Sequence, residues 1–139
     1  MKLCAVPVEL RKNSPDGSLT VIYVCVPFYT QQEERILQIF EMMPDSMQLL
    51  ILLYYYDYMQ EKEIAELTQW KMEKVSWAIK ISWREFCNAM KKDGNMNPFV
   101  IKRLIHETLD RAIQNEDLPL GTVEKVRLLI INKEKRDKQ

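Results

Sequence analysis

Glycine, histidine and net charge are all scarce in this sequence. Only three of the 139 residues are glycine and one is histidine, and 20 basic side chains are balanced by 20 acidic ones. The few glycines, together with 47% hydrophobic residues, exclude a collagen-like or low-complexity chain and predict a folded domain with a core. The zero net charge argues against a protein that binds nucleic acid through charge spread over its whole surface.

The residue clusters that form metal or catalytic sites are lacking as well. The cysteines Cys4, Cys25 and Cys87 are far apart, and no Cys-x-x-Cys pair or cysteine–histidine cluster occurs, so we expect reduced, buried thiols and no zinc site. There is no phosphate-binding glycine loop, nucleophile elbow or carboxylate–histidine metal pattern. His106 has no nucleophile beside it and is interpreted as structural. We therefore predict a protein that is not an enzyme, with no catalytic residues, metal or cofactor.

No segment is long and apolar enough to span a bilayer. The longest apolar run, residues 47–58, is interrupted by Gln48 and Asp57 and is shorter than the roughly 20 residues of a transmembrane helix. The N-terminus lacks the basic region, apolar stretch and cleavage site of a secretory signal. We expect a soluble, cytoplasmic protein with no membrane partner.

The charges are distributed unevenly along the chain. Residues 31–70 carry eight acidic and two basic side chains, a net charge of −6. Residues 71–92 carry six basic and two acidic ones, a net charge of +4. Such a change of sign is a hint of function, although solvated helix faces produce the same pattern.

The first thirty residues predict a β-hairpin. Residues 3–10 and 19–28 are rich in apolar and β-branched side chains, and the turn formers Pro15, Asp16 and Gly17 lie between them. The second strand is apolar on both faces, which predicts burial on both sides. A lone hairpin is marginal in water, so it must pack on the helices or pair with another chain. A homodimer through the open strand edge is one hypothesis.

Helical spacing of apolar residues predicts the rest of the chain to be helical. The segment Asp93-Gly94-Asn95 is read as a stop, and the chain from Lys133 onward as a frayed polar end. The tyrosine-rich stretch at 54–58 is interpreted as packing at a helix end rather than as a stacking platform. The expected helices cover residues 31–43, a segment from 44, 61–67, 71–90, 98–113 and 120–131.

Two short helices joined by a tight turn, the second of them basic, form the pattern of a helix-turn-helix. The triplet Glu63-Ile64-Ala65 is followed by the turn Gln69-Trp70-Lys71 and by Val75, twelve positions after Glu63. An aliphatic helix at 49–54 precedes the triplet. With this order and spacing, residues 44–90 resemble the C-terminal domain of bacterial sigma factors, the part that binds the promoter −35 element.

The resemblance implies a helix-turn-helix with a miniature core and a DNA-facing surface. Ala65 would allow the two helices to cross closely. On the DNA-facing surface, the basic side chains would reach phosphates, and Ser76 and Lys74 would read base edges. Trp77 has two other interpretations, a partner contact or part of the core. The expected core is Ile64, Leu67, Trp70, Val75 and Ile79. The DNA-facing positions are Lys71, Lys74, Ser76, Trp77, Lys80 and Arg84.

The chain departs from the family pattern at several positions. Tyr58 and Gln69 stand where the family usually has glycine, and a left-handed backbone at Gln69 costs a non-glycine residue about 1 kcal/mol. Gln60 stands where a serine or threonine usually caps the helix. Lys71 and Lys74 stand where serine and threonine are usual. The departures change the surface that would contact DNA rather than the fold.

We therefore predict a mainly α protein with a small N-terminal β-hairpin, a helix-turn-helix core and two C-terminal helices. The expected domains are residues 1–30, 31–92 and 96–139. The predicted function is a DNA-binding transcription regulator or accessory sigma-like factor, with duplex DNA and RNA polymerase as partners. The alternative is a protein-interaction module of the same fold that binds polymerase or a sigma factor and not DNA.

Overall fold

The computed structural model describes residues 3–10, 20–91 and 97–137. The chain forms two compact units, Met1–Gln31 and Gln32–Gln139. The described residues are mainly helical, with one two-stranded antiparallel sheet. The predicted fold class is therefore confirmed.

The first unit contains the predicted hairpin. Strand β1 (Leu3–Leu10) pairs with β2 (Thr20–Pro27) in an antiparallel register that aligns Leu3 with Pro27 and Leu10 with Thr20. Cys4 is aligned with Val26 and Cys25 with Ala5, so the two cysteines are not cross-strand partners. The predicted turn residues lie outside the described part of the chain.

The prediction that β2 is buried on both faces is wrong for the residues whose exposure is described. Val21 is 47% exposed, Ile22 40% and Tyr23 72%. Because side chains alternate along a strand, Ile22 points to the opposite face from its two neighbours. The physical reason is the size of the sheet, since two strands cannot cover their own faces and the alternation of the sequence says nothing about what covers them.

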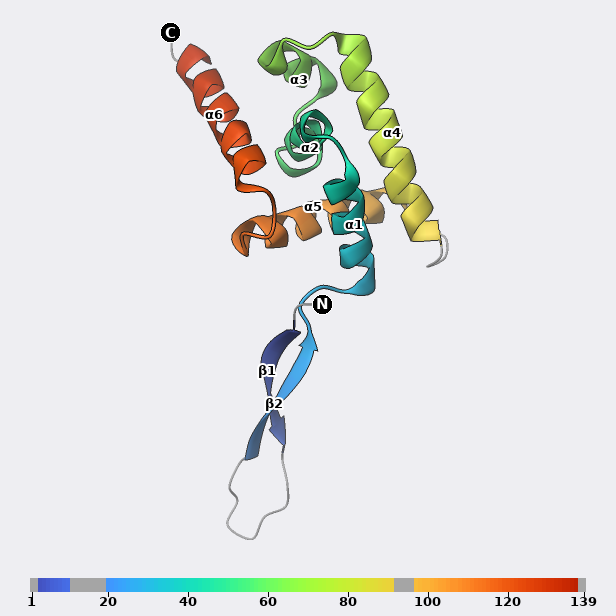
Figure 1. Cartoon of the computed structure of the whole chain (residues 1–139), viewed down its shortest axis with the longest axis vertical. Helices are drawn as coiled ribbons and strands as arrows, with labels where there is room; N and C mark the ends of the chain where they lie inside the picture. The colour runs from blue at the N-terminus through green and yellow to red at the C-terminus, as the bar shows by residue number, and fades with distance from the viewer. Residues whose placement is uncertain (1–2, 11–19, 92–96, 138–139) are drawn as a thin grey trace. The chain divides into compact units, whose positions relative to one another are not determined.

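The second unit contains the helices, which Figure 1 shows with α4 and α6 along opposite sides, α2 and α3 between them, and α5 across one end. The contacts agree with this view, because α2 and α3 each touch both α4 and α6, and α5 touches the π-helix η1 and α4. The helical segments are α1 (Gln31–Met42), α2 (Asp45–Ile51), η1 (Leu52–Tyr56), α3 (Glu61–Thr68), α4 (Met72–Met90), α5 (Pro98–Gln114) and α6 (Leu120–Asp137).

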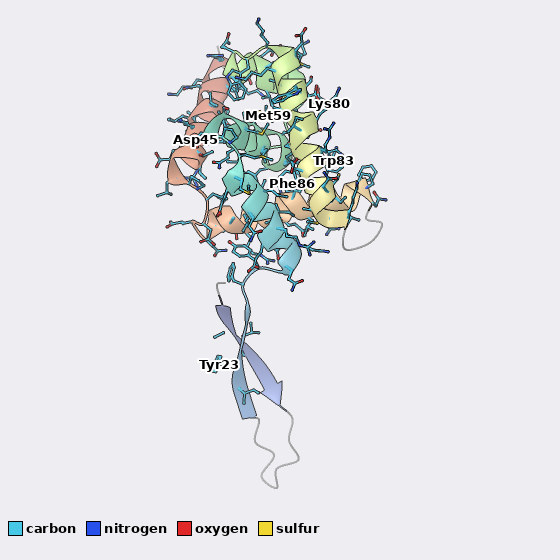
Figure 2. The ribbon with its side chains drawn as sticks, turned by 45° about the vertical axis from the view of Figure 1, so that its right-hand side comes forward. Tyr23, Asp45, Met59, Lys80, Trp83 and Phe86 are labelled. Atoms are coloured by element: carbon cyan, nitrogen blue, oxygen red, sulfur yellow. The ribbon has the colours of Figure 1, made fainter. Side chains whose placement is uncertain are left out.

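One hydrophobic core holds these helices together. Phe86 of α4 is fully buried, and its ring meets the Tyr55 ring edge to face, with centroids 5.6 Å apart. Figure 2 shows Phe86 on the inner side of α4 and Met59 in the middle of the unit. The largest fully buried side chains are Ile36, Phe40, Leu50, Ile51, Leu52, Leu53, Ile64, Val75, Phe86, Met90, Ile105 and Leu109.

The last helix is longer than the sequence predicted. Helix α6 continues to Asp137, whereas a frayed end was expected from Lys133. The Lys133 Nζ donates a hydrogen bond to Glu63 Oε2 of α3 at 2.8 Å. This contact pairs the last turns of α6 with a neighbouring helix, which a pattern of apolar spacing does not reveal.

A π-helix that the sequence did not predict follows α2. The Asp57 N–H donates to Leu52 O at 3.0 Å, a bond that spans five residues instead of four, and Tyr58 then adopts a left-handed backbone with φ 55°. Such wide turns are rare and often occur at functional sites. Here η1 inserts an extra residue between α2 and α3, so helical periodicity is lost at the tyrosine-rich stretch.

His106 is held by contacts within the fold, as expected of a structural histidine. Its ring stacks on Tyr56 and Tyr58, with centroid distances of 5.3 and 4.7 Å. Its Nδ1 lies 3.2 Å from Tyr55 O, and because a carbonyl oxygen only accepts, Nδ1 carries the hydrogen. The free thiol of Cys87 is half-buried, and this burial raises its pKa.

Asp57 follows η1, and one of its carboxylate oxygens lacks a hydrogen bond within the described part of the chain. Its Oδ2 is buried and has no hydrogen-bond partner among the described residues. Burial raises the pKa of Asp57, and the nearby His106 opposes this shift only in part. A carboxyl group whose pKa is raised by folding stabilises the protein below its unfolded pKa of about 3.9, and this stability is lost as the pH rises through the folded value.

Asp57→Asn is therefore expected to stabilise the protein at neutral pH and to have little effect in acid. We expect a gain of about 0.5 kcal/mol near pH 7, modest because water screens a partly exposed carboxylate. Urea unfolding of both proteins near pH 7 and near pH 3 measures the difference. A gain that is equal at both pH values would show that ionisation of Asp57 is not the cause.

Candidate nucleic-acid interface

Helices α3 and α4 and the turn between them have the geometry of a helix-turn-helix. Thr68 Oγ1 donates to Ile64 O at 2.7 Å and accepts from the Trp70 N–H at 3.3 Å, which ties the end of α3 to the turn. The Gln69 side chain donates to Glu66 O at 2.9 Å. Helix α4 then starts at Met72. The predicted pair of helices and its turn are thus present.

Both positions where the sequence lacks an expected glycine have a left-handed backbone. Gln69 has φ 63° and ψ 20°, and Tyr58 has φ 55°. Only glycine occupies this region without a steric penalty. The prediction that the turn needs a left-handed residue at Gln69 is confirmed.

Gln69→Gly is expected to stabilise the protein by about 1 kcal/mol, because it removes the left-handed penalty and loses only an exposed side-chain bond. Urea unfolding followed by circular dichroism measures the change. The matched control is Gln38→Gly on an exposed, right-handed turn of α1, where glycine should destabilise by about 1 kcal/mol. A loss of stability in both variants would mean that the turn is not left-handed in solution.

The miniature core of the motif forms largely as predicted. Ile64 and Val75 are fully buried, and Leu67 and Ile79 are nearly so. Trp70 is only half-buried and packs at the edge of this core. The small group therefore holds α3 and α4 at a fixed angle, which positions the outer face of α4.

The two helix starts lack side-chain caps. Gln60 precedes α3 and Lys71 precedes α4, and neither side chain accepts a hydrogen bond from the first turn of its helix. Serine, threonine or aspartate would do so. The long side chain of Lys71 is instead exposed at the start of α4, beside the backbone N–H groups that carry positive charge.

The six predicted DNA-facing residues do not share one face. Trp77, Lys80 and Arg84 are exposed and recur at intervals of three and four, which places them in one row along α4. Lys74 lies three positions before Trp77 and lines the same cavity as Trp77, with its Nζ 4.8 Å from the centre of the Trp70 ring. Lys71 is exposed at the helix start. Exposed basic side chains thus occur along α4 from its start to Arg84.

Ser76 is engaged within the motif. Its side chain is half-buried, and its Oγ donates to Glu61 Oε2 of α3 at 2.6 Å. Contact with a base edge would require this hydrogen bond to be broken. Its role in reading sequence is therefore the least favoured of the six by the local geometry.

Trp77 belongs to the surface. It is 59% exposed, so the interpretation of Trp77 as a core residue is wrong. Together with Trp70 and Lys74 it lines a cavity of about 300 Å³ between α2 and α4. The other lining residues are Pro44, Ser46, Met47, Leu50 and Ala78.

Acidic side chains lie on α3, next to this basic helix. Glu61, Glu63 and Glu66 are all on α3, and the hydrogen bond from Lys133 holds the pKa of Glu63 below its usual range. The same contact raises the pKa of Lys133. The change of charge sign along the sequence thus falls between the two helices of the motif. Of these two helices, α4 is the one that offers a favourable potential to phosphates.

The described residues contain neither a metal-ligand cluster nor a membrane-spanning helix. Residues 3–10, 20–91 and 97–137 contain no group of histidine, cysteine, aspartate and glutamate side chains that would hold a metal ion. In the same ranges, no helix has the combined length and apolar character that crossing a bilayer requires.

No protein-family model, curated protein or solved structure matches this chain. The similarity of residues 44–90 to a sigma-factor domain therefore stays a prediction.

Proposed function

We propose that this chain is a DNA-binding transcription regulator, or an accessory sigma-like factor, which acts in the cytoplasm and contacts promoter DNA with α4. The observation that carries the proposal is the left-handed turn at Gln69, which joins α3 to a helix bearing exposed basic side chains. A helix in this arrangement is the part of a helix-turn-helix that enters the major groove.

The length and charge of α4 suit this role. Its 19 residues span about 28 Å, enough for its first turns to lie in the groove while later turns pack in the core. Lys71 and Lys74 lie at the helix start, with Lys80 and Arg84 about two to four turns further on. Such side chains position a protein on phosphates.

RNA polymerase is proposed as the partner that completes the binding. The acidic side chains of α3 and the zero net charge of the chain leave only a local basic surface, and affinity for DNA grows with the number of phosphates neutralised. A complex with polymerase would supply the affinity that this surface lacks.

The test is a titration of labelled duplex DNA of about 20 base pairs, two helical turns, at about 50 mM salt. We expect the double variant Lys74→Ala with Lys80→Ala to bind about 10- to 100-fold more weakly, with a slope of log affinity against log salt smaller by about 2. Lys125→Ala, an exposed lysine on α6, is the matched control. Equal binding by the double variant and this control would contradict the proposal.

A protein-interaction module is the second candidate, and the cavity beside Trp77 favours it. An exposed tryptophan on the edge of an apolar cavity is typical of an interface anchor. In this case Trp77→Ala should abolish capture of purified RNA polymerase or sigma factor, while no binding to the duplex is seen for any variant. Binding to the duplex that depends on Lys74 would rule this candidate out.

A further inference from the structure

A second groove lies between η1, α4 and α5, and we propose that it binds an unpaired nucleotide. The base would lie between the rings of Tyr54 and Trp83, and the phosphate would meet Lys102 and Lys80. This ligand differs from the duplex DNA assigned to the outer face of α4, and the inference does not depend on that assignment.

The groove consists of two adjoining cavities of about 310 and 210 Å³. They share Tyr54, Tyr55 and Lys102. Their combined size lies within the range of small-molecule sites. The larger cavity is completed by Ile79, Lys80, Trp83 and Pro98, and the smaller one by Tyr58, Met59 and Gln60.

Two aromatic rings face a common point in this groove. The Lys102 Nζ lies over the Tyr54 ring, 5.9 Å from its centroid, and over the Trp83 ring, 5.7 Å from its centroid. Both rings therefore present their faces to the space that this ammonium group occupies. A flat base in that space could stack on either ring, which contributes strongly to binding of unpaired bases.

The Lys102 ammonium group interacts only weakly with the two rings. Both of its ring distances lie close to the outer limit of about 6 Å for a cation–π contact, and its side chain is exposed. A phosphate would pair with the same ammonium group more strongly, because both partners are then charged. When a nucleotide binds, its base can thus displace the Lys102 ammonium group from the two rings. Its phosphate can then pair with that same ammonium group.

The charge of the groove is of one sign. Lys80 and Lys102 are the charged residues among those that line the two cavities, and no acidic side chain lines either. A cavity between α5 and α6 is lined instead by Glu116, Glu124 and Arg127. Figure 2 shows Lys80 and Trp83 about one turn apart on α4, so a phosphate and a stacked base would be contacted from one helix.

The base must be unpaired for this contact. In a duplex, both faces of each base are covered by its neighbours, and stacking on a protein ring requires a free face. Tyr58, which is 70% exposed, and Gln60 lie at the smaller cavity, where a hydroxyl and an amide are available for the edge of the base.

The binding test uses the intact protein with Trp70→Phe and Trp77→Phe, so that fluorescence reports on Trp83 alone. The probes are thymidine monophosphate and an oligothymidylate of about ten nucleotides. We expect both probes to quench the fluorescence of Trp83. Tyr54→Leu should bind them about tenfold more weakly, because a stacking face is lost while apolar bulk is kept. Lys102→Ala, which changes an exposed side chain and spares the core, should weaken binding to a similar extent.

The matched controls are Phe99→Ala, an aromatic ring that is 81% exposed on α5, and Lys125→Ala on α6. Quenching by the monophosphate with these variant effects would identify a free nucleotide as sufficient, and quenching by the oligonucleotide alone would identify a single strand. Either result supports the site. Unchanged Trp83 fluorescence at saturating oligonucleotide, or equal affinities for Lys102→Ala and the controls, would overturn it.

Discussion

Phe86→Ala is expected to lower the free energy of unfolding by about 3–5 kcal/mol, the largest effect of any single substitution considered for this protein. The side chain is fully buried, and its ring meets Tyr55 edge to face. Its removal leaves a cavity between α4 and η1, where the surrounding helices cannot fully collapse. The effect should therefore exceed the loss of buried apolar area alone.

Urea unfolding followed by circular dichroism measures this loss. Phe99→Ala is the matched control, because the same substitution at a ring that is mostly exposed should change stability by less than about 0.5 kcal/mol. Since Phe86 of α4 packs against Tyr55 of η1, one cooperative transition is expected for the helical unit. An equal effect of the two substitutions would contradict the described core.

Gln48→Met is expected to cost about 2–3 kcal/mol, although methionine is similar in size and more apolar. Gln48 is buried, and its Nε2 donates to Phe40 O at 2.9 Å and to Met43 O at 3.1 Å. These carbonyls lie at the end of α1, where helical partners run out. Without the amide, Met43 O would lose this donor and Phe40 O would keep, among the described donors, only the Met43 N–H, which lies 3.2 Å away.

Gln38→Met on the exposed side of α1 is the matched control, and it should have little effect on stability. The comparison separates the hydrogen bonds of Gln48 from any general effect of glutamine-to-methionine exchange. A stabilising effect of Gln48→Met would mean that burial of apolar surface outweighs the two hydrogen bonds, contrary to the expectation.

The sequence anticipated the local structure well, because local structure depends on near neighbours. Apolar spacing and turn residues predicted both strands and most helix boundaries. The resemblance to the sigma-factor pattern also predicted the left-handed backbone at Gln69, whereas that of Tyr58 was not predicted. These features are decided by residues a few positions apart, within reach of a pattern.

The errors occurred where distant segments decide the outcome. The burial of β2 was overestimated because a two-stranded sheet cannot cover its own faces. The end of α6 was placed too early because its stabilising partner, Glu63, lies 70 positions away from Lys133. The π-helix was missed because its extra residue breaks the helical period on which the prediction relies.

The candidate sites show the same division. The sequence alone determined the helix-turn-helix segment and the basic side chains of α4, since both follow from spacing and composition. Tertiary structure alone decided that Ser76 is engaged by Glu61, that Trp77 is exposed, and that Tyr54, Trp83 and Lys102 line one groove. The physical reason is that exposure and convergence depend on how helices pack, and packing brings together residues that no local pattern connects.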